Sequence, residues 1–282
     1  GRLVALKVLS SRLASDPEFV ARFQREVKAS GSLQHPNIVH AFGSGEDAGQ
    51  PYMAMDFVDG KSLGKLLREE IRLPERRCLE IALDVARGLD HAHNAGIVHR
   101  DVKPDNVLID EKGRARLSDF GLAKLLREDQ QLTQSGIALG TPHYISPEQV
   151  SANRYIDHRA DQYSLGAMMY HMLTGQVPFD GATNNEIMLA HLEDTLPDPR
   201  KIRPQISEAV VRIVFKLMAK KSAERYDSTG QVVDDLQNVL QSKEPLYATK
   251  TSVGQPARAK SQKEGCLLIA CVAFCMAWLL LC

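Results

Sequence analysis

A polar segment at 99–106 (HRDVKPDN) carries three side chains that could take part in one reaction. A carboxylate such as Asp101 can accept a proton from a hydroxyl, an ammonium such as Lys103 can face a phosphate, and the amide of Asn106 can bind a metal. Apolar residues flank the segment on both sides, and Pro104 rules out a regular helix. We therefore expect a loop held at both ends, which suits reactive groups. For any one of these residues alone, an ordinary solvated turn is the simpler interpretation.

Two further residues extend this candidate site. Lys7 interrupts an apolar, strand-like stretch at 3–9, where a lysine is costly to bury unless it is paired. A lysine on an edge strand that reaches solvent is the plain alternative. Asp119 opens an Asp-Phe-Gly triplet directly after a predicted hairpin of strands 107–109 and 115–117. The triplet alone is a weak signal, but its place shortly after the polar segment makes it a strong one.

The elements that position these residues fall into two parts. The first part alternates strands and one helix, 16–33, which Asp16 caps and which repeats Phe19, Phe23 and Val27 at helical spacing. A strand at 52–58 closes this part. From residue 62 onward the pattern is mainly helical. The predicted helices cover 62–70, 75–95, a stretch that opens at 157, and then 184–192, 208–219 and 230–241.

The composition limits the function classes. The net charge of this 282-residue chain is zero, so no basic field favours nucleic acid as a partner. Four of the five cysteines lie in one apolar tail without polar ligands beside them, which is neither a disulfide framework nor a zinc pattern. A reducing compartment is the simpler expectation for the globular part.

The last 40 residues consist of a polar segment followed by an uncharged, apolar one. Residues 243–264 are polar, rich in Lys and Arg, and without a period, which predicts a linker. Residues 265–282 carry no charge and just reach the length of about 18 residues at which a run becomes a candidate membrane span. A buried core helix is the alternative. Lys260 and Lys263 precede the run, which would place the globular part on the cytoplasmic side of the cell membrane.

The ordered motifs resemble those of the eukaryotic-like (Hanks-type) serine/threonine protein kinases of bacteria, many of which are anchored by one membrane span. Residues 99–106 match their H-R-D-x-x-x-x-N catalytic loop and Asp119 opens their Asp-Phe-Gly motif. Residues 140–148 (GTPHYISPE) match the end of their activation segment, with Ser146 in place of the usual alanine. The resemblance covers residues 3 to about 241.

This resemblance implies an α+β, bilobal fold. A small, β-rich N-lobe would occupy 1–57 and a larger helical C-lobe 58–242, followed by a juxtamembrane linker at 243–264 and a candidate transmembrane helix at 265–282. The family places a glycine-rich loop on a hairpin before the strand that holds Lys7. The sequence starts at that strand, so we expect an N-terminally truncated lobe that lacks its first two strands and binds ATP weakly.

The resemblance also implies roles for single residues. Asp101 would be the catalytic base, helped by Lys103 and Asn106, while Lys7 would pair with Glu26. Asn106 and Asp119 would hold Mg²⁺, with Mn²⁺ as an alternative. One departure is Ser30, where the family has a larger apolar residue that stacks this helix on the core. The residues expected to bind ATP are Ala5, Lys7, Met55 as the gatekeeper, Asp56 and Val58 in the hinge, Leu108 and Asp119.

The remaining implied roles concern activation and support. Arg100 beside Asp101 is typical of kinases that are switched by phosphorylation of the activation segment. Thr133 and Ser135 are the expected autophosphorylation sites, and Thr141 is expected to face the substrate. Three residues would have structural roles, namely Glu148, Asp161 and Arg225.

The function that follows is ATP-dependent phosphorylation of Ser and Thr in proteins by a non-specific serine/threonine protein kinase. The expected partners are protein substrates, the membrane, and a second copy of the chain for autophosphorylation in trans, but not nucleic acid. A pseudokinase or scaffold is the main alternative, which the truncation favours and the intact catalytic residues oppose. Phosphotransferases of small molecules share part of the loop but lack the segment 140–148.

Overall fold

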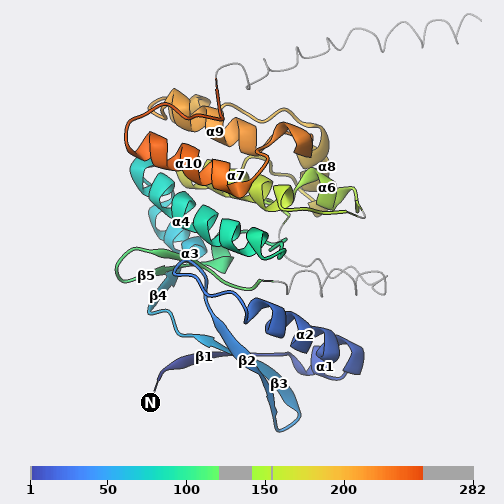
Figure 1. The fold of residues 1–282 in the computed structure, drawn as a ribbon. Helices are drawn as coiled ribbons and strands as arrows, with labels where there is room; N and C mark the ends of the chain where they lie inside the picture. Colours follow the sequence, from blue (N-terminus) through green and yellow to red (C-terminus); the bar gives the residue numbers. More distant parts are fainter. Residues whose placement is uncertain (1, 121–141, 154, 250–282) are drawn as a thin grey trace, which may run out of the picture.

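The computed structural model describes residues 2–120, 142–153 and 155–249. In this part of the chain a small lobe with a β-sheet precedes a larger lobe that is built mainly of helices (Figure 1). The predicted α+β, bilobal architecture is therefore confirmed. Each lobe has its own core, because one cluster of buried side chains lies in the small lobe and a second, larger cluster fills the helical lobe.

The small lobe is an antiparallel sheet covered by a helix. Strands β1 (Val4–Val8), β3 (Gln50–Asp56) and β2 (Ala41–Asp47) lie side by side in this order. A one-turn helix α1 (Ser11–Ala14) leads into helix α2 (Pro17–Ser30), and the Asp16 carboxylate accepts the backbone N–H of Phe19 at 3.2 Å as its cap. Phe19, Phe23 and Val27 repeat on one face of α2 and pack against the sheet.

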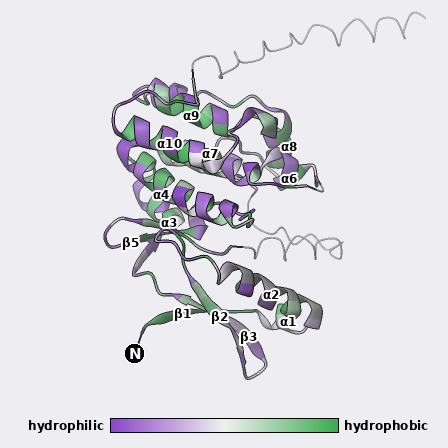
Figure 2. Cartoon of the chain, viewed as in Figure 1, coloured by the Kyte–Doolittle hydropathy of each residue, from purple (hydrophilic) through white to green (hydrophobic). Residues whose placement is uncertain are grey.

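Strand β1 shows the alternation of a strand with two different faces. Ala5 and Lys7 are half-buried, whereas Val4, Leu6 and Val8 are exposed on the opposite face. Figure 2 shows this hydrophobic strand at the edge of the small lobe. The period of two therefore directs Lys7 and Ala5 to the same side of the sheet.

A second sheet lies where the two lobes meet. Strands β4 (Gly60–Ser62), β5 (Val107–Asp110) and β6 (Ala115–Leu117) pair antiparallel in this order, which confirms the predicted hairpin of β5 and β6. Strand β4 was not predicted, since three residues are too few for a periodic signal. Two backbone hydrogen bonds connect Leu117 of β6 to the small lobe. Its oxygen accepts the N–H of Val39 at 2.9 Å, and its N–H donates to the oxygen of Asn37 at 2.8 Å.

The larger lobe is organised around a helix that is buried on all sides. Helix α7 (Arg159–Thr174) has buried residues at nearly every position and packs against α4 (Glu75–Asn94) and α9 (Glu208–Leu217). The helices that the 3.6-residue period predicted are present with ends shifted by a few residues. The other elements are α3 (Leu63–Glu70), η1 (Pro104–Asn106), α6 (Pro147–Val150), α8 (Asn184–Glu193), η3 (Pro199–Lys201), η4 (Ser222–Glu224) and α10 (Thr229–Leu240).

The first residues of the predicted linker pack against α10. The buried Asp235 carboxylate accepts backbone N–H groups from Leu246, Tyr247 and Ala248 at 2.6, 3.0 and 2.8 Å. Ala248 is fully buried in the core of the large lobe. Residues 243–248 therefore run along the large lobe.

The predicted fold class needs one correction, which concerns the membrane-spanning helix. Within 2–120, 142–153 and 155–249, no helix is long and apolar enough to cross a bilayer. Helix α4 has the required length of 20 residues but carries charged side chains along it. The segment 265–282, to which the prediction referred, lies outside the described residues.

A buried histidine in the large lobe makes folding sensitive to acid. His191 on α8 is fully buried, its Nδ1 lies 2.9 Å from the hydroxyl of Tyr163, and burial together with the charge of Lys220 lowers its pKa to about 3. In the unfolded chain it takes up a proton near pH 6.5, so the unfolded state binds more protons between pH 6.5 and about 3.

We therefore expect the free energy of unfolding to fall by up to about 1.4 kcal/mol per pH unit below pH 6.5 from this residue. His191→Asn removes the titrating group and should flatten this dependence, although it lowers stability at neutral pH. Urea unfolding at several pH values measures both slopes, and equal slopes for the two proteins would refute the assignment.

Candidate active site

The loop between α4 and β5 fixes the orientation of the Asp101 carboxylate. Its Oδ2 accepts a hydrogen bond from Lys103 Nζ at 2.6 Å and one from Asn106 Nδ2 at 2.9 Å. Asn106 Nδ2 also donates to the backbone oxygen of Asp101 at 2.8 Å. Pro104 starts the short helix η1, which turns Asn106 back toward Asp101. One carboxylate oxygen is thus held in place, while the hydrogen bonds found for Asp101 among the described residues leave Oδ1 without a donor.

A buried carboxylate supports this loop from the large lobe. Asp161 on α7 is fully buried and accepts the backbone N–H groups of His99 at 2.8 Å and Arg100 at 2.7 Å. Its Oδ2 also lies 2.8 Å from His93 Nε2. Burial by itself raises the pKa of Asp161, but the hydrogen bond and charge of His93 and the bond from His99 hold the pKa below its ordinary value. Asp161 therefore stays ionised at neutral pH.

His99 connects the loop to the Asp-Phe-Gly motif. Its Nε2 donates to the backbone oxygen of Ser118 at 2.8 Å, while Nδ1 accepts the N–H of Asp101 at 3.2 Å, an assignment that requires a neutral ring. The ring also packs in a T-shaped arrangement with the ring of Phe120, with 4.6 Å between the centroids. A fully buried histidine thus fixes the positions of two segments that carry predicted catalytic residues.

Lys7 contacts Asp119 across the two lobes. The distance from Lys7 Nζ to Asp119 Oδ1 is 2.7 Å, and both side chains are partly exposed. Ser118 donates to the backbone oxygen of Asn106 through its N–H at 2.9 Å and its hydroxyl at 3.1 Å. Because Asp119 follows Ser118 directly, its backbone lies close to Asn106. Glu26, the predicted partner of Lys7, lies in α2, but its side chain lies outside the described residues.

The residues predicted to bind ATP come from both sheets. Ala5 and Met55 stand opposite each other in the pairing of β1 with β3, and Ala5 shares a face with Lys7. Leu108 is half-buried on β5, and Val58 is half-buried in the connection that follows β3. The structure therefore brings Ala5, Lys7 and Met55 together on one sheet, with Leu108 on the other.

Asp56 has a role that the sequence did not indicate. Its buried carboxylate pairs with Arg116 of β6 at 2.5 Å and with Arg2, and its N–H donates to the backbone oxygen of His40 at 2.9 Å. Arg116 also donates to the backbone oxygen of Ile38 at 2.9 Å. Neither the N–H nor the carboxylate of Asp56 is therefore free for a nucleotide, and the side chain ties the two sheets together.

Glu148 and Arg225, the two remaining residues with predicted structural roles, contact each other. The side chain of Arg225 is fully buried, and its guanidinium donates two hydrogen bonds of 2.6 and 2.9 Å to the Glu148 carboxylate. This pair holds α6 against the large lobe. Thr133, Ser135 and Thr141 lie outside the described residues.

Sequence reasoning missed three residues of this site, namely His93, Arg116 and Gln149. Their contacts join positions far apart in the chain, and only Gln149 carried a local signal. It stands three residues after Ser146, the spacing of a helix capping box, and its side chain reaches the backbone of Arg100 at 2.9 Å.

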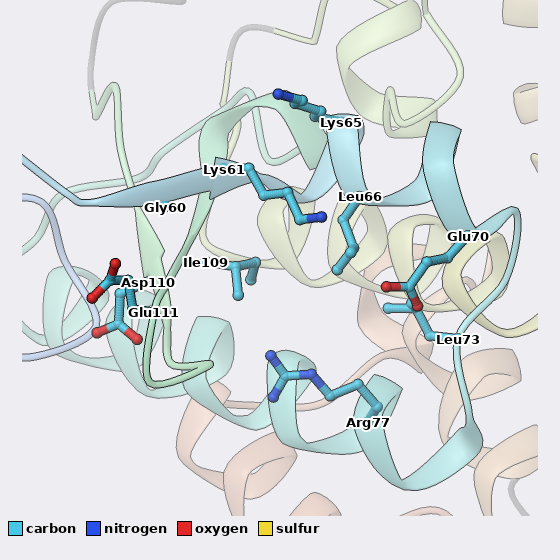
Figure 3. Close-up of a pocket in the computed structure, with 10 residues that line it drawn as sticks. All are labelled: Gly60, Lys61, Lys65, Leu66, Glu70, Leu73, Arg77, Ile109, Asp110 and Glu111. Carbon is cyan, nitrogen blue, oxygen red and sulfur yellow. The ribbon is translucent and has the colours of Figure 1, made fainter.

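A separate pocket of about 470 Å³ lies between α3, the start of α4 and the strands β4 and β5 (Figure 3). The apolar side chains of Leu66, Leu73 and Ile109 line it, and the charged ends of Lys61 and Arg77 point into it. None of its lining residues belongs to the predicted site.

Comparison with known proteins identifies the family of this chain. The protein kinase domain family matches residues 1–238. The probable serine/threonine-protein kinase PknB of Lactococcus lactis is 38% identical over 235 residues, and the serine/threonine-protein kinase PrkC of Bacillus subtilis is 35% identical over 239 residues. These matches cover 83% and 85% of this chain, which spans only 37% of the length of either relative.

Solved structures show the same fold. The crystal structure of the Mycobacterium tuberculosis PknI kinase domain superposes with a TM-score of 0.65 and is 32% identical, covering 83% of this chain and 84% of that one. A single-site mutant of the same domain gives a TM-score of 0.64 at 33% identity, with 83% of each chain covered. The chain therefore belongs to the protein kinase domain family and carries a kinase domain of the bacterial serine/threonine type.

Proposed function

We propose that this chain transfers the γ-phosphoryl group of ATP to serine and threonine hydroxyls of proteins. The observation that carries the proposal is the convergence of Asp101, Lys103 and Asn106 in one hydrogen-bonded cluster. The contact of Lys7 with Asp119 at 2.7 Å adds a cation from the small lobe. Phosphoryl transfer depends mainly on positioning and charge neutralisation, and these residues supply both.

The proposed mechanism assigns one task to each side chain. Asp101 orients the acceptor hydroxyl through Oδ1, which accepts no hydrogen bond from the described residues, and accepts the proton late in the transfer. Lys103 is 2.6 Å from Asp101, so it can neutralise a phosphate that arrives beside this hydroxyl. Lys7, whose side chain is partly exposed, is available to the other phosphates of ATP. Ser/Thr rather than Tyr is the proposed acceptor because the family resemblance assigns this preference to Lys103 together with Thr141.

The described residues fit a divalent cation that is shared with ATP. Both N–H groups of the Asn106 amide are directed at Asp101, so its oxygen remains for a cation, and Asp119 adds a carboxylate. Among the described residues no group of three His, Cys, Asp or Glu could hold a metal alone. Two oxygen donors suit Mg²⁺, with Mn²⁺ as the alternative, because Mg²⁺ keeps waters and substrate phosphates as ligands. When bound, the ion neutralises charge on the phosphate oxygens.

The direct test is incubation of the full chain with γ-labelled ATP, Mg²⁺ and a generic basic protein, followed by analysis of phosphorylated amino acids. We expect label on serine and threonine and none without Mg²⁺. Asp119→Asn serves as the control for cation binding and should abolish labelling. Binding of ATP without any transfer would contradict the proposal and favour the pseudokinase. Label on tyrosine alone would contradict the acceptor class.

We also propose that the chain phosphorylates itself at Thr133 or Ser135. The support is Arg100, whose backbone N–H is held by Asp161 and whose guanidinium could pair with a phosphate near Asp101. Phosphosite mapping after incubation with ATP should find phosphate at one of these residues in the wild type and none in Asp101→Asn. Phosphate only at other positions would rule out this regulation. Self-association and location in the cell stay predictions.

A further inference from the structure

The backbone at Arg100 adopts a conformation that needs support. Its φ is +68°, in the left-handed region, which costs a residue with a side chain roughly 1–2 kcal/mol. The neighbouring peptide groups are all held: Asp161 accepts the N–H of Arg100, and His99 accepts the N–H of Asp101. The backbone oxygen of Arg100 accepts a hydrogen bond from Gln149 Nε2 at 2.9 Å.

Gln149 uses both ends of its amide. Its side chain is on α6 and the residue is only 8% exposed. Its Oε1 accepts the backbone N–H and the hydroxyl of Ser146, each at 3.1 Å, which leaves Nε2 to face the oxygen of Arg100. The reversed amide would place two donors together at Ser146 and two oxygens together at Arg100, so the orientation of the amide is determined.

The helix that carries Gln149 is itself anchored. The adjacent Glu148 makes two bonds to the buried guanidinium of Arg225, and Pro147 is buried at the start of α6. Gln149 therefore connects an anchored helix to the peptide group between Arg100 and Asp101. A displacement of this peptide would rotate the Asp101 carboxylate away from Lys103 and Asn106.

We propose that Gln149 is a positioning residue for phosphoryl transfer, which holds the peptide between Arg100 and Asp101 in the orientation that catalysis requires. This inference rests on the proposed function. The side-chain hydrogen bonds of Gln149 go to Ser146 and Arg100 and not to Ala5, Lys7 or Met55, the residues predicted to hold ATP, so we expect it to act on turnover and not on nucleotide binding. Ser146 contributes by fixing which end of the Gln149 amide faces the loop.

Two variants separate this role from simple helix capping. Gln149→Glu keeps an acceptor for Ser146, and Glu and Gln serve equally in a capping box, but it places an oxygen against the Arg100 oxygen. Gln149→Met keeps the volume and removes every hydrogen bond. We expect kcat to fall about tenfold or more in both, with the KM for ATP changed less than twofold. The exposed Gln205, replaced by Glu and by Met, is the matched control and should leave both constants unchanged.

If Gln149→Glu turns over as fast as the wild type, the proposal is wrong, since only helix capping would then matter. A change in the KM for ATP without a change in kcat would also overturn it. Deuterium exchange of the full chain gives a readout that does not need activity. The amides of residues 99–101 should exchange at least fivefold faster in both Gln149 variants than in the wild type and the Gln205 controls. Unchanged exchange in the Gln149 variants would refute the positioning role, whether or not the wild type transfers phosphate. The absence of phosphate transfer by the wild type would count against the proposed function alone.

Discussion

Asp101→Asn is expected to lower the rate of phosphoryl transfer by about 10³-fold, because an amide cannot accept the proton of the substrate hydroxyl. The substitution keeps the size of the side chain and an oxygen for Lys103 and Asn106, which bind the carboxylate at 2.6 and 2.9 Å. The loop should therefore stay folded. Turnover with saturating ATP and a protein substrate measures kcat, and nucleotide titration should give an unchanged affinity for ATP.

Asp105→Asn is the matched control for this substitution. Asp105 lies on the same loop, its side chain is 62% exposed, and its partner Arg68 is an exposed residue at 3.6 Å. Exposed pairs of this kind contribute little, so the variant should fold and turn over like the wild type. A loss of less than tenfold in Asp101→Asn, or an equal loss in Asp105→Asn, would show that Asp101 is not the base.

Arg225→Met is expected to lower the free energy of unfolding by about 3–5 kcal/mol, because it leaves the Glu148 carboxylate without its buried partner. The Arg225 side chain is fully buried and the Glu148 side chain is 12% exposed. The guanidinium also donates to the backbone oxygens of Ala219 and Arg159 at 2.9 and 2.8 Å and lies 4.9 Å from the ring of Tyr163. Urea unfolding monitored by circular dichroism measures the loss.

The control for Arg225 is another arginine with a short ion pair that lies at the surface. Arg200 contacts Asp198 at 2.7 Å, but its side chain is 42% exposed, so Arg200→Met should cost less than about 1 kcal/mol. Combining Arg225→Met with Glu148→Gln should recover part of the loss, since no unpaired charge then remains. Losses of equal size for Arg225→Met and Arg200→Met would mean that the Glu148–Arg225 pair does not anchor α6.

The helices and the hairpin were predictable because each leaves a local pattern. Phe19, Phe23 and Val27 recur at the spacing of a helical face, and α2 packs these same residues against the small sheet. The short strand predicted before Asp119 became β6, and Pro104 marked the break that the short helix η1 occupies. The order of the catalytic motifs was visible for the same reason, since each motif is short and contiguous.

Contacts between distant segments were not predictable from spacing. Gln149 reaches Arg100 across 49 residues and Arg116 reaches Asp56 across 60 residues, so no periodic signal connects them. Asp56 was predicted as part of the hinge, and the sequence did not show that its carboxylate also joins the two sheets by pairing with Arg116. Lys7 illustrates the same limit, since its sequence surroundings showed that a partner was needed but did not show that the partner is Asp119.

The most direct measurement compares the wild type with Asp101→Asn and Lys7→Met in one reaction that follows label from the γ-phosphate of ATP to protein serine and threonine. We expect steady transfer by the wild type, about 10³-fold slower transfer by Asp101→Asn with ATP still bound, and loss of transfer by Lys7→Met. Wild-type protein that binds ATP but transfers no label, or variants that transfer as fast as the wild type, would contradict the assignment of this site to phosphoryl transfer.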